Sequence, residues 1–219
     1  MPYFFATRSG ERVEITGRDA GHLARSLRAR PGERISVVEP AGRLLTVRLD
    51  RVSPRSVTGF VEAEVEHDPE PRRSITLAVA MLPAASLELV LSRCTELGAA
   101  RFALVNADRS ISRATDKAQR WATICREAAM LAGRLVVPEV LSPQPFPTAW
   151  EQAKEPWLLD RSGQPFSAPS SGATLFIGPE GGWSPGELNV AGDRVRSLGP
   201  RNLRADTAAL AALAISLAG

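Results

Sequence analysis

The feature that most constrains the fold is an unbroken apolar segment at Ile75–Leu82, which reads ITLAVAML. A strand with one solvent-exposed face alternates apolar and polar residues, whereas a strand covered by helices on both faces is apolar throughout. Further strand-like segments lie at 102–105, 157–159 and 174–177, and helical patterns separate them. Strands that alternate with helices predict a mostly parallel α/β sheet for the chain after residue 72.

The helices are predicted from apolar residues at 3.6-residue spacing. The longest covers about Thr115 to Ala132, and shorter helices cover 86–97 and begin at Pro185. The final helix, from about Asp206 to Leu217, is apolar on nearly every side, so we expect it to be buried in a core or against another subunit. Asp206 is its expected N-cap residue, because a short carboxylate accepts hydrogen bonds from the first free amides of a helix.

The first 70 residues have the pattern of a small β-rich domain, with alternating or β-branched strand segments, turns between them and one short helix. The strand segments are 35–38, 44–52 and 57–65, and the helix is 19–28. An acidic stretch then ends at Pro71. We therefore predict a β-rich domain at 1–71 and a larger α/β domain at 72–219.

Basic residues are concentrated in the first two thirds of the chain, and 25 of the 27 are arginine. Residues 1–60 carry 11 arginines against 6 acids, a net +5, and residues 141–219 carry 6 basic residues against 7 acids, a net −1. A GC-rich genome also favours arginine codons, so the distribution is more informative than the total. It predicts a nucleic-acid contact surface in the front of the chain and a small-molecule site at the back. The candidate nucleic-acid contacts are Arg8, Arg25, Arg28, Arg30 and Arg109.

Several protein classes are disfavoured by what the sequence lacks. Two cysteines, Cys94 and Cys125, lie in helical patterns and are expected to be buried reduced thiols. Two distant histidines, His22 and His67, are too few for a histidine metal site, so we expect no metal. There is no apolar run long enough for a membrane span and no signal-like N-terminus. We therefore expect a cytoplasmic protein without a membrane partner.

A glycine-rich turn at Gly178–Gly182 is the most informative segment. It follows a buried strand and precedes a helix whose start is specified by Ser184 and Glu187 at capping-box spacing and by Pro185 at the first helical position. In open α/β sheets ligands bind at the carboxyl ends of strands, and glycines let the backbone approach them closely. The spacing matches neither a phosphate loop nor a dinucleotide fingerprint, so adenosine held by backbone groups fits better. The alternative is a plain tight connection.

A second turn, at Gly199-Pro200, leads into the final helix. Arg204 stands near the start of that helix, where the helix dipole disfavours a cation. This placement favours a functional role for Arg204 over that of a surface arginine. The two turns together predict one ligand site in the last third of the chain.

The two turns resemble those of the RsmE family, SPOUT-class methyltransferases of small-subunit ribosomal RNA. The matching motifs are Gly178-Pro179-Glu180-Gly181-Gly182 and the segment from Leu198 to Ala208, which reads LGPRNLRADTA. Shorter matches extend the resemblance over essentially the whole chain. In the first 70 residues they are His22-Leu23 and Leu27-Arg28, and further along they are Thr95–Gly98, Arg109-Ser110, Glu127–Ala129, Gly133-Arg134 and Val137–Glu139.

The resemblance implies a trefoil-knotted α/β domain behind an N-terminal PUA-like β-barrel that binds RNA. It also implies a homodimer with the active site at the subunit interface, and S-adenosylmethionine-dependent methylation of N3 of a uridine in 16S ribosomal RNA, free or in the small subunit. Arg204 is the expected catalytic residue. The expected cofactor-binding residues are Ile177, Gly178, Pro179, Glu180, Gly181, Gly182, Leu198, Gly199, Leu203, Arg204 and Thr207.

The chain departs from the family pattern at three places. Met130-Leu131 replaces a usual Glu-Gln pair, Ala84 replaces a lysine, and Asp206 replaces a glutamate. The first two remove polar groups and bear on RNA affinity and target more than on the cofactor. Two alternatives stay open: a non-catalytic RNA-binding protein with an inactive SPOUT fold, and an adenine-nucleotide enzyme, which would lack phosphate-binding signatures.

Overall fold

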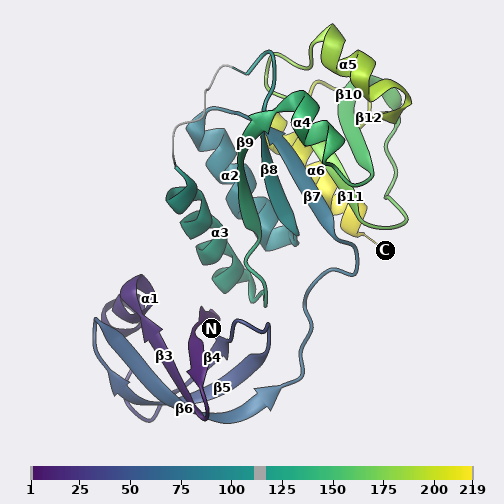
Figure 1. Cartoon of the computed structure of the whole chain (residues 1–219). Helices are drawn as coiled ribbons and strands as arrows, with labels where there is room; N and C mark the ends of the chain where they lie inside the picture. Colours follow the sequence, from purple (N-terminus) through teal and green to yellow (C-terminus); the bar gives the residue numbers. More distant parts are fainter. Residues whose placement is uncertain (1, 111–116, 219) are drawn as a thin grey trace. The chain divides into compact units, whose positions relative to one another are not determined.

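The computed structural model describes residues 2–110 and 117–218, which form two compact units (Figure 1). The first unit contains Met1–Glu70 together with Ala129–Val136. The second contains Pro71–Ala128 and Val137–Gly219. The segment 129–136 therefore packs with the N-terminal unit, which the sequence did not indicate.

The first unit is built on a curled six-stranded sheet with the order β1-β4-β5-β6-β3-β2 (Figure 1). Its strands are β1 Phe4–Phe5, β2 Thr7–Ser9, β3 Arg12–Thr16, β4 Arg34–Val38, β5 Leu44–Val52 and β6 Ser56–Val65. β1 and β4 are parallel, and every other pair in this sheet is antiparallel. The three predicted strands are confirmed, and β1, β2 and β3 were not predicted.

Alternation along β5 explains which face of this sheet is covered. Leu45, Val47 and Leu49 are buried, whereas Arg48 and Asp50 are exposed. A side chain at Gly59 of β6 would place its Cβ 2.6 Å from the Arg48 carbonyl oxygen, so only glycine permits the close approach of β6 to β5 there. The register of this pair shifts between Leu49 and Arg51.

The predicted helix at 19–28 exists but is divided and ends earlier. α1 covers Gly17–Gly21, and a π-helical turn, η1, covers His22–Ser26. Leu23 is buried in the core of the unit, as the amphipathic spacing predicts. Arg28 has a φ of +53° and so lies outside the helix.

The segment Ala129–Val136 joins the first unit through its core and its backbone. Met130 is buried there, and its carbonyl oxygen accepts a 3.0 Å hydrogen bond from the Tyr3 amide. Leu131, the second residue of the departure from the family pattern, is 71% exposed. Of the two residues, Met130 therefore has a structural role, and only Leu131 is available to a partner or to RNA.

The second unit contains a six-stranded sheet with the order β12-β10-β11-β7-β8-β9, and every pair in it is parallel (Figure 1). Its strands are β7 Ile75–Ala80, β8 Arg101–Asn106, β9 Glu139–Pro145, β10 Pro156–Pro165, β11 Ala173–Ile177 and β12 Val195–Ser197. The predicted parallel sheet is confirmed. The two outermost strands, β9 and β12, were not predicted.

Both faces of this sheet are covered, as the apolar segment predicts. Leu77 and Val79 of β7 belong to one hydrophobic core, and the alternate residues Ala78 and Ala80 belong to another. Successive side chains of a strand point to opposite faces, so the two cores lie on opposite sides of the sheet. The helices of the chain after residue 72 are α2 Ala84–Leu97, α3 Ala118–Ala132, α4 Phe146–Glu151, α5 Pro185–Ala191, the 3-10 helix η2 Gly192–Arg194 and α6 Ala205–Leu217.

The last helix, α6, packs against α2, β7 and β11. One side of it is buried through Ala205, Ala209, Ala212 and Leu213. The other side is partly or fully open in this single chain, through Thr207, Leu210, Ala211, Ala214, Ile215 and Ala218. The single chain therefore buries one side of α6, and cover of the other side by another subunit stays a prediction. None of the described helices is long and apolar enough to cross a membrane.

Candidate cofactor-binding site

A cavity of about 450 Å³ lies beside β10, β11 and the segment that follows β12. Its walls come from three segments, Leu159–Arg161, Ile177–Trp183 and Leu198–Ala208. Small-molecule sites in proteins are of this size, and open α/β sheets place them where parallel strands end.

The glycine-rich turn connects β11 to α5 through the predicted capping box. The Ser184 hydroxyl accepts a 3.2 Å hydrogen bond from the Glu187 amide, and the Glu187 carboxylate accepts a 2.7 Å bond from the Ser184 amide. Pro185 occupies the first turn as predicted. The start of α5 is therefore specified locally, which fixes the end of the turn.

Glu187 also ties the turn to the loop after β8. Its second carboxylate oxygen accepts a 3.0 Å hydrogen bond from the Asp108 amide, and the Ser184 hydroxyl donates a 2.5 Å bond to the Asp108 carboxylate. One guanidinium nitrogen of Arg109 donates a 3.1 Å bond to the Gly181 carbonyl oxygen. Arg109, predicted as a nucleic-acid contact, therefore lies against the glycine turn.

Three glycines have distinct physical reasons to be glycine. Gly182 has a φ of +67° and Gly199 a φ of +106°, a region that side chains rarely adopt. At Gly178 a Cβ would lie 3.0 Å from the indole nitrogen of Trp183, whose N–H donates a 3.1 Å bond to the Leu159 carbonyl oxygen. This bond joins the turn to β10 across the cavity wall.

The second turn is held by Ser197, whose hydroxyl accepts from the Gly199 amide and donates to the Gly199 carbonyl oxygen, both at 3.2 Å. The prediction that Asp206 caps α6 is wrong. The N-cap is Arg204, without a side-chain cap bond, because Ala205 is already helical. Asp206 lies inside the first turn, where its carboxylate accepts a 2.7 Å bond from the Thr207 amide.

Arg204 lines the cavity, and 75% of its side chain is exposed. A guanidinium nitrogen of Arg204 lies 3.2 Å from a carboxylate oxygen of Asp206, whose side chain is 13% exposed. The acid offsets the unfavourable interaction between the cation and the positive end of α6. The ion pair thus keeps a cation at an otherwise unfavourable place beside the cavity.

The structure brings together all the predicted cofactor-binding residues except Thr207. Thr207 is exposed and not part of the lining, and its hydroxyl contacts the Asp206 carboxylate. The sequence reasoning did not identify several lining residues, which are Leu159, Asp160, Arg161, Trp183, Arg201, Asn202, Ala205 and Ala208. The rule that ligands bind where parallel strands end would have found the first three, because they follow the predicted strand at 157–159.

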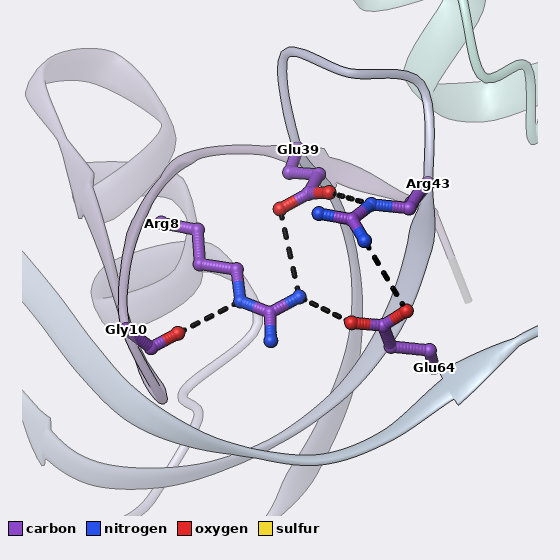
Figure 2. Close-up of polar contacts among 5 residues, drawn as sticks. All are labelled: Arg8, Gly10, Glu39, Arg43 and Glu64. Carbon is purple, nitrogen blue, oxygen red and sulfur yellow. Dashed lines mark hydrogen bonds and ion pairs between the residues drawn. The ribbon is translucent and has the colours of Figure 1, made fainter.

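Arg8 is held by a network of its own unit (Figure 2). Its guanidinium donates to the Gly10 carbonyl oxygen at 2.8 Å and to the Glu64 carboxylate at 2.5 Å, and lies 3.7 Å from the Glu39 carboxylate. Arg43 pairs with the same two acids. The hydrogen bond from Arg8 lowers the pKa of Glu64 below its ordinary value.

Other arginines of this unit differ in whether an acid pairs with them. Arg12 is paired with Asp50, and Arg34 and Arg48 share Glu62. For Arg25, Arg28 and Arg30, by contrast, the described part of the chain contains no ion pair. Their charges are therefore available to an external anion.

Both cysteines are buried and outside any disulfide, as predicted. Burial raises the pKa of the Cys94 thiol to about 12. Because the thiolate is the reactive form, Cys94 is inert at neutral pH.

The fold is that of an α/β protein with a cavity between two glycine-containing turns. A family model described as an RNA methyltransferase domain matches residues 68–217. Ribosomal RNA small subunit methyltransferase E from Synechocystis sp. is 30% identical over 92% of this chain and 71% of that protein, and the Bacillus subtilis protein of the same name is 28% identical over 97% and 94%. The crystal structure of the Neisseria gonorrhoeae protein of that name, bound to S-adenosyl methionine, has a TM-score of 0.88 at 28% identity and covers 98% of this chain and 95% of its own. The chain belongs to the RsmE family of RNA methyltransferases.

Proposed function

We propose that this protein transfers a methyl group from S-adenosylmethionine to N3 of a uridine in 16S ribosomal RNA. The observation that carries the proposal is the cavity between the two glycine-containing turns, with Arg204 at its wall. Family membership supplies the reaction class. We also propose a cytoplasmic location, because ribosomal RNA is found there.

The residues present fit an adenosine cofactor. Ile177, Leu198 and Leu203 give the cavity apolar walls. Among the hydrogen bonds of the described residues, none uses the backbone amides of Gly181 or Leu203, so these donors are free for a ligand. When bound, S-adenosylmethionine supplies an electrophilic methyl group.

The chain's own residues must bind and orient the uridine. The proton on N3 must leave, and negative charge then spreads onto the imide oxygens. Arg204 is placed to donate to those oxygens, which stabilises the charge more as it grows. Asp206 is paired with Arg204, whereas Glu180 of the cavity wall has no hydrogen bond or ion pair among the described residues, so we assign the N3 proton to Glu180. Taking the uridine out of its stack costs a few kcal/mol.

The test is methylation of defined RNA with mass spectrometry of the product nucleosides. Small subunits or 16S RNA from a strain lacking the enzyme should gain one 3-methyluridine, and RNA from a wild-type strain should gain none. A protein that binds the cofactor and the RNA without forming a methylated nucleoside would instead be the non-catalytic RNA-binding module.

Gly182→Ala is expected to weaken S-adenosylmethionine binding about tenfold. An alanine at a φ of +67° costs about 1–2 kcal/mol, so the turn relaxes away from the geometry that the ligand needs. Gly186→Ala is the matched control, because Gly186 lies in α5 with an ordinary φ and 3.7 Å of space for a Cβ. Calorimetry measures the S-adenosylmethionine affinity of both variants. An unchanged affinity in folded Gly182→Ala would show that binding does not depend on the positive φ of Gly182.

We infer a homodimer through the open side of α6. The partly exposed residues on this side are Leu210, Ala211, Ala214, Ile215 and Ala218. They form an apolar stripe at helical spacing, and a two-fold partner is the simplest cover for it. Arg204 begins the same helix, so the proposed site lies next to the proposed interface.

From the resemblance to the RsmE family we also propose that the second unit has the trefoil knot of SPOUT proteins and that the first unit is a PUA-like RNA-binding domain.

RNA binding by the first unit is expected to depend on its unpaired arginines. Arg25→Gln, Arg28→Gln or Arg30→Gln should each flatten the slope of log affinity against log salt by about one unit. The control Arg12→Gln removes a charge that Asp50 already balances, so its slope should match the wild type. For the same reason Arg8 is not proposed as a phosphate contact. Equal slopes in both groups would contradict this assignment.

A further inference from the structure

Asp160 lies in the wall of the proposed cofactor cavity, and the function proposed above assigns no role to it. It directly follows Leu159, the last residue of β10 that pairs with β11, through Ile177. Between Leu159 and Gln164 the register of β10 with β12 shifts, so Asp160 stands where the regular ladder is interrupted. Irregular strands often re-aim a side chain next to a site.

The carboxylate of Asp160 is oriented by its own loop. One oxygen, Oδ1, accepts a 2.9 Å hydrogen bond from the Ser162 amide and a 2.7 Å bond from the Ser162 hydroxyl. No bond or ion pair of Oδ2 occurs within the described residues. Asp160 therefore combines a fixed orientation with one free acceptor, as a pre-organised ligand group requires.

The cavity restricts which donor of the cofactor can reach this oxygen. Asp160 follows the buried Leu159, which pairs with the buried Ile177 and whose carbonyl oxygen accepts a bond from the buried Trp183, and the cation of Arg161 follows it in the same wall. An ammonium group is costly to remove from water into such surroundings, whereas a hydroxyl costs much less. The other acid of the lining, Glu180, is exposed and is already assigned to the N3 proton of the uridine. The ribose hydroxyls are the neutral donors of an adenosine ligand.

We propose that Asp160 binds a ribose hydroxyl of the cofactor and makes the site selective for ribosides over deoxyribosides. The proposal rests on the proposed use of S-adenosylmethionine. An acidic residue on a ribose hydroxyl also serves dinucleotide-binding folds, where a carboxylate near a strand end performs the same recognition. Here the carboxylate follows the strand directly and is held by Ser162.

The test compares the binding of four probes by calorimetry. Two are ribosides: S-adenosylhomocysteine, and 5′-methylthioadenosine, which has the ribose but no amino acid. The other two are the 2′-deoxy and 3′-deoxy forms of 5′-methylthioadenosine. Asp160→Ala should weaken both ribosides about tenfold to a hundredfold, the usual range for a hydrogen bond to a charged group. The deoxy form that lacks the contacted hydroxyl should bind the wild type and Asp160→Ala equally.

Two variants control for structure. Asp160→Asn keeps an acceptor for the Ser162 amide and should retain the fold while losing part of the riboside preference. Asp193→Ala removes an acid of η2 that is absent from the cavity wall, and should change none of the affinities. Thermal unfolding reports whether each variant is folded.

Other outcomes overturn the assignment. If Asp160→Ala weakens S-adenosylhomocysteine but not 5′-methylthioadenosine, the carboxylate binds the ammonium group instead. If it weakens ribosides and both deoxyribosides equally, Asp160 only shapes the loop. Either result leaves the proposed cofactor in place, whereas a wild-type protein that binds none of the adenosine probes refutes the proposed function itself.

Discussion

Arg204→Ala is expected to lower the rate of methyl transfer about tenfold to a thousandfold, as the loss of one donor to a developing oxyanion does in other enzymes. The side chain of Arg204 is 75% exposed at the cavity wall, and it lies at the start of α6, where Asp206 is its one ion-pair partner among the described residues. Because most of the side chain is solvent-exposed, little folding energy depends on it. The affinity for S-adenosylmethionine should therefore change far less than the rate.

Single-turnover methylation at saturating cofactor measures this effect, with light scattering as the check on assembly. Arg194→Ala is the matched control, because Arg194 is also a surface arginine of the second unit but pairs with Glu155 and is absent from the cavity wall. Arg204→Lys should recover only part of the rate, because an ammonium group is a point charge without the paired donors of a guanidinium. A full rate in Arg204→Ala would show that Arg204 is not the donor to the imide oxygens of the uridine.

Local sequence chemistry predicted the parts of the site that depend on neighbours in the chain. Ser184, Pro185 and Glu187 specify the start of α5 within four residues, and the structure contains the full capping box. The apolar segment at 75–82 predicted a strand buried on both faces, which β7 confirms. Such features are predictable because the residues that interact are close in sequence.

Contacts between distant segments were not predictable in this way. Nothing in the sequence around Asp108 indicates that its amide binds the carboxylate of Glu187, because that residue already has a complete local role in its helix. The edge strands β9 and β12 also escaped prediction. β9 contains two prolines, Pro143 and Pro145, and β12 has only three residues. Both lie at sheet edges, where prolines and short strands are tolerated because one side of the ladder is unpaired.

The final helix shows why an apolar composition alone does not give burial. α6 is apolar around its circumference because it is rich in alanine, yet the described chain covers only the side that faces α2, β7 and β11. The assignment of Asp206 as the N-cap failed for a related reason. A capping residue needs extended backbone before the first turn, and here the extended residue is Arg204, with a ψ of 153°.

Glu70→Ala is expected to have the largest effect on stability, about 3 kcal/mol, because it removes one partner of a buried ion pair. The Arg134 side chain is only 6% exposed, and its guanidinium donates bonds of 2.5 Å and 3.1 Å to one Glu70 oxygen. The other oxygen accepts from the amides of Leu135 and Val136, at 2.9 Å and 3.2 Å. One carboxylate thus joins the end of the N-terminal segment to residues 134–136, which are distant in sequence but belong to the same unit.

Removing that carboxylate leaves a buried cation without its main anion and frees two backbone amides. For a unit of this size the loss corresponds to a melting transition lower by roughly 10 °C or more. Hydrogen exchange at Leu135 and Val136 should also accelerate, since these amides lose their acceptor. Glu70→Gln keeps a neutral acceptor, so its melting temperature should lie between those of the wild type and Glu70→Ala. Glu66→Ala removes an exposed acid that has no hydrogen bond among the described residues, and it should melt at the wild-type temperature. If the amides of Leu135 and Val136 still exchange slowly in Glu70→Ala, the core around Met130, and not this carboxylate, holds the segment in the first unit.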